Sequence, residues 1–340
     1  MNLDQLKSTA GAMVAPGKGI LAMDESHPTC NKRFEKLGIP TTEEKRREYR
    51  SMLLKEDQMG AYIGGAILFD ETIRQTTSDG LPFSQRLAAI GIVPGIKVDQ
   101  GAKPLAGFAG EKVTEGLDGL RERLAEYYDL GARFAKWRAV ITIGEDIPTD
   151  GCLMANAHAL ARYAALCQEA AIVPIVEPEV LMDGDHTIER CDEVTRATLK
   201  VVFAQLAEQR VVFEGMVLKP NMVVSGADCG EQADIQAVAK RTVACLLDTV
   251  PEDVPGIAFL SGGQSDAEAT AHLNAMNALG KALPWALTFS YGRALQQAAM
   301  KAWGGLPENI HHAAQVILHR AKMNGAAATG HYTTQMEQAA

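Results

Sequence analysis

The chain has 340 residues, with 33 Lys and Arg against 42 Asp and Glu, so its formal charge at neutral pH is −9. Apolar residues make up 47% of the sequence, which is enough for a large buried core and excludes a disordered chain. The acidic balance also argues against a nucleic-acid or anionic-membrane partner, because both favour a basic surface. A small anionic ligand is still compatible, since it contacts only the side chains that line its pocket.

Short apolar segments recur along the chain, separated by longer segments with helical periodicity. They predict eight strands, at residues 18–24, 63–69, 93–98, 132–141, 173–180, 212–220, 256–262 and 286–291. Apolar stripes and stop signals between them predict helices over 116–130, 153–170, 265–279, 292–303 and 307–324. Ser265, with Glu268 three residues later, is a capping-box pattern that marks one helix start.

This alternation predicts an α/β fold, a single-domain (β/α)8 barrel over residues 1–324. An open, doubly wound sheet is the structural alternative. Residues 325–340 are small and polar without an apolar stripe, so they are predicted to form a flexible C-terminal tail.

Several common sequence signals are absent. The N-terminus has no apolar stretch of signal-peptide type, and no apolar run approaches the length of a membrane span, which predicts a soluble cytoplasmic protein. The six cysteines form no C-x-x-C pair and are interpreted as reduced thiols. No G-x-G-x-x-G follows the first strand and no H-x-x-x-H occurs, so the sequence predicts neither a dinucleotide cofactor nor a catalytic metal.

Charged residues lie near the C-terminal ends of the predicted strands. Lys136 and Arg138 share one face of the fourth strand, and Glu177 and Glu179 share one face of the fifth. Three further charged residues lie at strand ends: Asp24, Lys97 and Lys219. Each alone is compatible with a solvated side chain or a helix cap. A barrel, however, gathers all eight strand ends at one mouth, so together they predict a catalytic cluster of mutually neutralising charges.

Lys219 follows an apolar strand and directly precedes a proline. Burial and a nearby cation such as Lys136 would favour its neutral amine, which is the nucleophile that a Schiff base with a carbonyl substrate requires. Glu177 and Glu179 are suited to transfer protons during addition and dehydration, and Asp24 to act as a base on a substrate hydroxyl.

Two glycine-containing segments follow the last two predicted strands. LSGGQS (260–265) offers the backbone N–H of Gly262 beside Ser261, and SYGR (290–293) opens a helix with Arg293. Either segment alone is compatible with a plain turn. Barrel enzymes often bind phosphate with the loops after strands seven and eight, so the two together favour a phosphate site.

The order and spacing of nine motifs resemble those of the class I fructose-bisphosphate aldolases. The motifs are LAMDES (21–26), GGAILF (64–69), GIKVD (95–99), FAKWR (134–138), PIVEPE (174–179), LKPNM (218–222), FLSGGQS (259–265), WALTFSYGRALQ (285–296) and KAWGG (301–305). The resemblance runs from about Val14 to Tyr332. It implies a glycolytic lyase that needs no metal and no cofactor, and that reversibly cleaves a phosphorylated sugar, fructose 1,6-bisphosphate, to dihydroxyacetone phosphate and glyceraldehyde 3-phosphate. It also implies a homo-oligomer, commonly a tetramer.

The same resemblance implies a role for each matching residue. Lys219 matches the Schiff-base lysine, and Glu177, with Glu179 beside it, matches the group that handles protons in carbinolamine dehydration. Asp24 resembles the base for the 4-hydroxyl, and Lys136 the cation next to the Schiff-base nitrogen. The implied substrate-binding residues are the cation Arg138, then Ser261, Gly262, Ser290, Gly292 and Arg293 around the 1-phosphate, and Lys97 and Ser26 towards the 6-phosphate, near Lys32 and Arg33.

Two segments depart from the family pattern. Residues 27–29 are His-Pro-Thr where eukaryotic relatives typically have Thr-Gly-Ser, which affects the loop towards the 6-phosphate. The sequence ends in EQAA, whereas well-known members end in a tyrosine that assists proton transfer at C3, and Tyr332 matches a position before that extension. We therefore expect slower proton exchange at C3 than in tyrosine-tailed relatives, measured as detritiation of dihydroxyacetone phosphate relative to cleavage.

Two other functions are compatible with parts of this pattern. One is a related Schiff-base aldolase or transferase acting on a monophosphorylated sugar, which a comparison of fructose 1,6-bisphosphate with fructose 1-phosphate would separate. The other is a barrel retained as a non-catalytic scaffold. The intact set of Asp24, Lys136, Glu177 and Lys219 argues against a scaffold, because buried charges are costly without a function.

Overall fold

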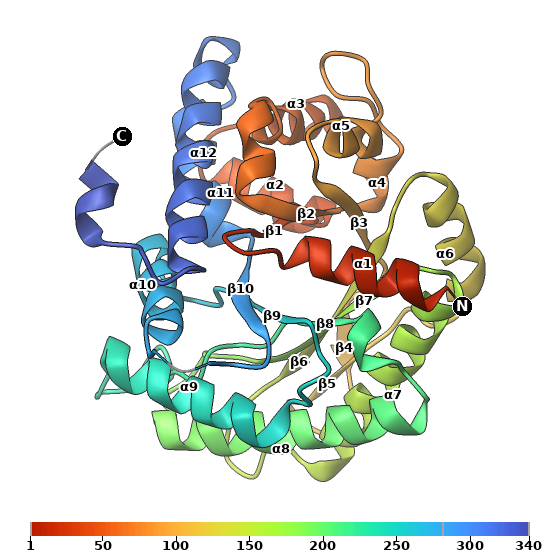
Figure 1. Cartoon of the computed structure of the whole chain (residues 1–340), viewed down its shortest axis with the longest axis vertical. Coiled ribbons are helices and arrows are strands. Elements are labelled where there is room, and N and C mark those ends of the chain that lie inside the picture. The colour runs from red at the N-terminus through yellow and green to blue at the C-terminus, as the bar shows by residue number, and fades with distance from the viewer. Residues whose placement is uncertain (1, 281, 339–340) are drawn as a thin grey trace.

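Figure 1 shows the computed structural model of the chain, which describes residues 2–280 and 282–338. Within this range, eight parallel strands close a barrel in the order β1-β10-β9-β8-β7-β6-β3-β2. These strands are β1 Gly19–Ala22, β2 Ile63–Leu68, β3 Val93–Lys97, β6 Phe134–Ile141, β7 Val173–Val180, β8 Val217–Leu218, β9 Gly256–Phe259 and β10 Ala286–Tyr291. The prediction of a (β/α)8 barrel is confirmed. An open doubly wound sheet is excluded because β1 pairs with both β2 and β10.

Helices surround the barrel (Figure 1). They are α1 Leu3–Met13, α2 His27–Glu35, α3 Glu43–Leu53, α4 Asp70–Ile73, α5 Phe83–Ala89, α6 Leu120–Asp129, α7 Asp150–Glu169, α8 Ile188–Glu208, α9 Ile235–Thr249, α10 Asp266–Asn277, α11 Arg293–Trp303 and α12 Ile310–Ala327. Short 3-10 turns lie at η1 Asp57–Ala61, η2 Phe213–Gly215, η3 Pro307–Asn309 and η4 Thr334–Gln338. A small antiparallel hairpin pairs β4 Ala102–Pro104 with β5 Lys112–Thr114.

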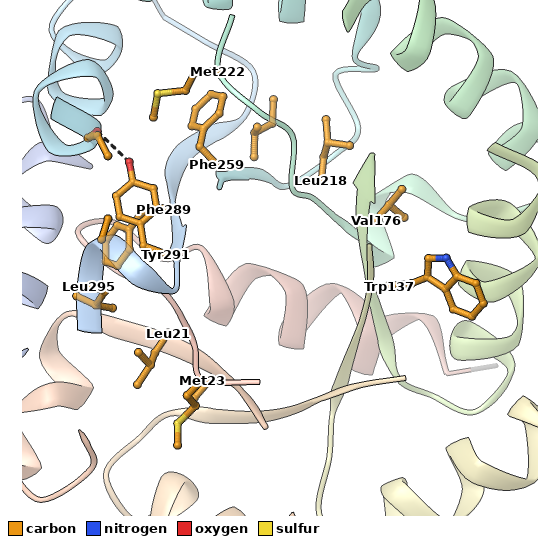
Figure 2. Packing of buried hydrophobic residues seen from close by; sticks show 14 of the residues in the cluster. Leu21, Met23, Trp137, Val176, Leu218, Met222, Phe259, Phe289, Tyr291 and Leu295 are labelled. Carbon is orange, nitrogen blue, oxygen red and sulfur yellow. Dashed lines mark hydrogen bonds between the residues drawn. The ribbon is translucent and has the colours of Figure 1, made fainter. Parts of the chain in front are cut away.

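The larger hydrophobic core lies between the barrel and its helices. Alternate strand residues point outward because successive side chains in a strand face opposite sides. Figure 2 shows part of this layer, in which Trp137, Val176, Leu218 and Tyr291 are fully buried. The hydroxyl of Tyr291 donates a hydrogen bond to the carbonyl oxygen of Ala269 at 2.9 Å, so this polar atom also has a partner inside the core.

A second apolar cluster fills the barrel interior at the N-terminal ends of the strands. Phe134 and Ile175 occupy inward positions, and Leu6 and Met13 of α1 belong to the same cluster. Figure 1 shows α1 lying across this end of the barrel. A Cβ at Gly95 would lie 2.2 Å from the ring of Phe134, so only glycine leaves space for that ring. The N-terminal end of the barrel is therefore closed by packing.

Inward-facing positions change from apolar to charged towards the C-terminal ends of the strands. The pattern is Phe134 then Lys136 on β6, Ile175 then Glu177 on β7, and Val217 then Lys219 at β8. Parallel pairing sets Arg138 of β6 beside Glu177 of β7, and Ile175 of β7 beside Val217 of β8, so on each strand the charged positions follow the apolar ones towards the same end of the barrel. The fold thus places the predicted cluster at one open end.

Some predicted boundaries differ from the structure. The predicted strand at 212–220 shortens to β8 because η2 turns the chain just before it. The predicted capping box is confirmed: the Ser265 side chain accepts from the Glu268 backbone N–H, and the Glu268 carboxylate accepts from the Ser265 N–H. The last helix continues to Ala327, beyond its predicted end at residue 324.

The segment predicted as a tail makes side-chain contacts with the body of the protein. Tyr332 is buried, and its hydroxyl donates to Glu337 Oε1 at 3.0 Å. Arg320 on α12 donates to the same carboxylate. Among the described residues, no helix is long and apolar enough to cross a bilayer, and the six cysteines have free thiols.

Candidate active site

A cavity of about 360 Å³ opens at the C-terminal ends of the barrel strands. Every residue predicted to act in catalysis or substrate binding lines it: Asp24, Ser26, Lys97, Lys136, Arg138, Glu177, Glu179, Lys219, Ser261, Gly262, Ser290, Gly292 and Arg293. Thr29 and Arg33 also line it, whereas Lys32 is exposed outside the lining. The structure therefore brings residues from seven of the barrel's βα units to one surface.

The centre of the cavity is a row of alternating charges. Lys219 Nζ lies 3.1 Å from Glu177 Oε1, and Lys136 Nζ lies 3.6 Å from Glu177 Oε2. Lys136 Nζ then pairs with Asp24 Oδ2 at 2.7 Å. The Lys219 side chain is only 6% exposed and that of Glu177 only 3%. Burial of this kind is tolerated because each charge faces an opposite one.

Two of the central charges, those of Asp24 and Lys136, are held in their ionised forms. Burial would raise the pKa of Asp24, but Lys136, Lys219 and Lys97 outweigh this effect and hold that pKa below its ordinary value. Burial would lower the pKa of Lys136, but the carboxylates of Asp24, Glu177 and Asp99 raise it. At neutral pH, Asp24 is therefore a carboxylate that can accept a proton, and Lys136 is a permanent cation.

One end of the cavity carries cations that are each paired with a carboxylate. Lys97 Nζ lies 2.6 Å from Asp99 Oδ1, and Arg138 Nε contacts Glu179 Oε2. Arg33 at this end pairs in the same way with Glu25, at 2.6 Å. The Arg138 side chain is 43% exposed, so it is accessible to a ligand from the cavity mouth.

The loop that differs from the family pattern, residues 27–29, forms the start of α2 at the same end. The hydroxyls of Ser26 and Thr29 lie 3.2 Å apart and both face the cavity. His27 turns away, with Nε2 3.0 Å from Glu71 Oε2 and its ring against Phe69. The departure in sequence thus leaves two hydroxyl groups on the cavity wall.

The opposite end is formed by the loops after β9 and β10. Gly262 has a φ of +53°, a left-handed conformation that glycine adopts without strain. Arg293, the first residue of α11, donates from Nη2 to the Gly262 carbonyl at 2.8 Å. Ser261 and Ser290 are buried, and Ser290 Oγ has no hydrogen-bond partner among the described residues. This end presents hydroxyl and guanidinium donors to the cavity.

Three positioning contacts were not found by sequence reasoning. Asp99 pairs with Lys97 and accepts a hydrogen bond from the backbone N–H of Arg138 at 3.3 Å. Its position two residues after Lys97, on the same face of an extended segment, is the one sequence signal for this contact. The other contacts join distant elements and carry no local signal: Gln264 with His272, and Met182 with the loop after β9.

The described residues contain no group of three or more His, Cys, Asp or Glu placed to hold a metal ion. The carboxylates at the cavity each face a lysine or arginine side chain instead. The lining is thus an amine, carboxylate and hydroxyl surface suited to a phosphorylated carbonyl compound.

A model of the family described as fructose-bisphosphate aldolase class-I matches residues 5–340. The chain belongs to the class I fructose-bisphosphate aldolase family. This membership confirms the resemblance noted in the sequence. It also identifies the protein as a lyase of a class that acts through a Schiff base.

Individual class I aldolases match over almost the whole chain. A probable fructose-bisphosphate aldolase class 1 of Xanthomonas campestris pv. campestris is 63% identical over 331 residues, covering 97% of this chain and 99% of the relative. Fructose-bisphosphate aldolase 4, cytosolic, of Arabidopsis thaliana is 49% identical and covers 96% of this chain and 84% of the relative. A co-crystal structure of the Plasmodium falciparum aldolase has a TM-score of 0.96, at 48% identity over 97% of this chain and 96% of the other.

Proposed function

We propose that this protein reversibly cleaves fructose 1,6-bisphosphate to dihydroxyacetone phosphate and glyceraldehyde 3-phosphate through a Schiff base on Lys219. The observation that carries the proposal is the buried Lys219 amine, 3.1 Å from the Glu177 carboxylate, inside a cavity with cations at both ends. Family membership supports the same reaction.

In the first steps, Lys219 attacks the C2 carbonyl of the open-chain sugar. The ammonium must lose a proton before it attacks, and Glu177 Oε1 is within hydrogen-bond distance to receive it. The amine adds to C2 and gives a carbinolamine, whose hydroxyl leaves as water once Glu177 returns a proton to it. The cation of Lys136, 3.6 Å from Glu177 Oε2, holds that carboxyl group in place.

In the cleavage step, Asp24 removes the proton from the 4-hydroxyl. The low pKa of Asp24 keeps it ionised and ready to accept this proton. The C3–C4 bond then breaks, and its electron pair flows into the iminium formed on Lys219, giving an enamine and glyceraldehyde 3-phosphate. Protonation of the enamine at C3 and hydrolysis release dihydroxyacetone phosphate, with Glu179 next to Glu177 as a further proton-transfer group.

The two ends of the cavity accommodate the two phosphates. Ser261, Gly262, Ser290, Gly292 and Arg293 bind the 1-phosphate with hydroxyl, backbone and guanidinium donors. Lys97, Arg138 and Ser26 bind the 6-phosphate at the other end. Cations at both ends favour a bisphosphate over a monophosphate.

We also propose that the protein is a cytoplasmic homotetramer. The support is membership of a family whose members commonly form tetramers, and the cytosolic designation of the Arabidopsis relative. Light scattering coupled to gel filtration should give four times the mass of one chain, and the mass of a monomer or dimer would contradict the tetramer.

The reaction is tested by assaying purified protein with fructose 1,6-bisphosphate and with fructose 1-phosphate, coupling triose phosphate formation to NADH oxidation. We expect turnover of both, with a higher kcat/KM for the bisphosphate. Turnover of neither substrate would overturn the proposal, and equal kcat/KM values would overturn the assignment of the 6-phosphate end. Lys219→Arg, which keeps the charge but cannot form the Schiff base at neutral pH, should abolish turnover.

A further inference from the structure

Met182 lies just beyond β7 and reaches across to the loop after β9. Its sulfur accepts a hydrogen bond from the backbone N–H of Gly263 at 2.8 Å. A Cβ at Gly263 would lie 2.5 Å from this sulfur and 3.1 Å from Met182 Cγ. The thioether therefore packs directly on the loop backbone, and a side chain at position 263 would displace it.

Each of the first three residues of the SGGQ loop is held by a different side chain. The Gln264 amide donates to the Ser261 carbonyl at 3.1 Å, and Arg293 donates to the Gly262 carbonyl at 2.8 Å. Met182 holds the third residue. Gln264 belongs to the loop itself and Arg293 to the neighbouring βα unit, so Met182 is the contact that links this loop to β7, the strand carrying the catalytic glutamates.

This contact restrains the two consecutive glycines of the phosphate-binding end. Two consecutive glycines sample many backbone conformations, and a ligand that needs one of them must order the loop as it binds. Ser261 and Gly262 line the cavity, whereas the N–H of Gly263 is directed to the Met182 sulfur. The sulfur thus selects the loop conformation in which the first two residues face the ligand.

We propose that Met182 is a positioning residue that pre-orders the SGGQ loop for the phosphate next to C1 of the substrate. The inference rests on the proposed function, which places that phosphate at this loop. It goes further by assigning a part of phosphate affinity to a side chain that does not line the cavity. Met182 acts through Gly263 and touches neither the substrate nor the reacting atoms.

The test uses two ketones whose carbonyl reacts with Lys219 in the same way, one with and one without the phosphate. Dihydroxyacetone phosphate and dihydroxyacetone are each titrated in the presence of borohydride, and the concentration for half-maximal trapping is measured. Met182→Leu keeps an apolar side chain of similar volume but removes the acceptor. Met182→Gln keeps the length and places a carbonyl oxygen near the sulfur position, so it should rescue the contact.

For Met182→Leu, we expect half-maximal trapping by dihydroxyacetone phosphate to need about three- to tenfold more ligand, the range for loss of one hydrogen bond. Trapping by dihydroxyacetone should be unchanged, because it has no phosphate for the loop to bind. Met182→Gln should behave like the unsubstituted protein for both ketones. In steady state, the Leu variant should raise KM for fructose 1,6-bisphosphate and leave kcat nearly unchanged.

Met154→Leu is the matched control, because Met154 is 49% exposed on α7 and away from the cavity. The proposal is overturned if Met182→Leu traps dihydroxyacetone phosphate normally, if both ketones are weakened equally, or if the Gln variant fails as the Leu variant does. Failure of the unsubstituted protein to trap dihydroxyacetone phosphate would instead overturn the proposed function, and this inference with it.

Discussion

The two ends of the cavity hold their cations in different electrostatic states. At the end formed by α2, β3 and β6, Lys97 and Arg138 are each in contact with a carboxylate. At the end formed after β9 and β10, Arg293 donates to the Gly262 carbonyl and makes no ion pair with a carboxylate over residues 2–280 and 282–338. The neighbouring donors there are hydroxyls, and one of them, Ser290 Oγ, has no partner among those residues.

This difference predicts different contributions to binding. A phosphate at the paired end competes with carboxylates for the same cations, so its net gain is small. A phosphate at the loop end meets donors that make no direct contact with a carboxylate among the described residues, and it gains charge-assisted hydrogen bonds directly. We therefore expect the loop end to supply most of the affinity, and the paired end to distinguish a bisphosphate from a monophosphate.

The largest expected effect follows from removing the guanidinium at the loop end. Arg293→Ala should lower kcat/KM for both fructose 1,6-bisphosphate and fructose 1-phosphate by about 10- to 100-fold, because a hydrogen bond to a charged group contributes about 1.5–3 kcal/mol. Arg121→Ala, whose side chain is 64% exposed, is the control. A loss confined to the bisphosphate would show that Arg293 was assigned to the wrong phosphate.

A smaller effect is expected at the paired end. Arg138→Gln should lower kcat/KM for fructose 1,6-bisphosphate by about three- to tenfold, since the lost interaction is a net gain of about 0.5–1.5 kcal/mol. Kinetics with fructose 1-phosphate, which lacks the second phosphate, should change little. The same substitution at Arg162, exposed on α7, should leave both substrates unaffected. An equal loss for the two substrates would remove the distinction between the ends.

Salt should weaken binding of the bisphosphate more than that of the monophosphate, because only the second phosphate meets the cations Lys97 and Arg138 of the paired end. Raising the KCl concentration from about 0.05 to about 0.5 M should increase KM for fructose 1,6-bisphosphate roughly two- to threefold more than KM for fructose 1-phosphate, because screening weakens accessible charges most. Parallel increases for the two substrates would contradict this part of the comparison. An uncharged osmolyte at matched osmolality controls for effects other than ionic strength.

The smallest effect is expected on the pH dependence of stability, through His272, which contacts the loop after β9. His272 Nδ1 lies 2.6 Å from Gln264 Oε1, and burial, partly offset by the charge of Glu268, lowers the pKa of His272. The unfolded chain therefore binds a proton at His272 more readily than the native state. This contribution to stability is present above the unfolded pKa of about 6.5 and is lost as the pH falls towards the native pKa.

In the unsubstituted protein, the free energy of unfolding should fall between about pH 7 and pH 5 as His272 titrates, by at most about 1.4 kcal/mol per pH unit. Replacing His272 with Asn, which keeps a neutral hydrogen-bond donor, should remove this part of the fall. Urea unfolding of both proteins across this range measures the difference. Stability curves that stay parallel would show that His272 does not titrate differently in the two states. His158→Asn is a control, since His158 is exposed on α7.

The barrel itself was predictable because its signal is local. Each buried strand is a short apolar run, and each charged residue follows such a run, as Lys219 follows Val217 and Leu218. Once the strands are taken to close a barrel, their C-terminal ends must meet. The residues of the central cluster could therefore be named without coordinates, although their pairing could not: that Lys136 is closer to Asp24 than to Glu177 depends on side-chain packing.

What the sequence missed are contacts between distant segments. Met182 meets Gly263 and His272 meets Gln264 through side chains whose positions are set by several elements together. The β4–β5 hairpin was missed because three-residue strands show no periodicity. The predicted strand at 212–220 was too long because its apolar residues were read as extended, although Phe213 begins a 3-10 turn.

The central claim is that Lys219 forms the covalent intermediate, and borohydride trapping tests it most directly. The protein is incubated with dihydroxyacetone phosphate, reduced with borohydride and digested, and the modified peptide is identified by mass spectrometry. The account predicts one adduct, on Lys219, and none in Lys219→Arg. An adduct on Lys136 or Lys97, or no adduct while the protein still cleaves fructose 1,6-bisphosphate, would contradict it.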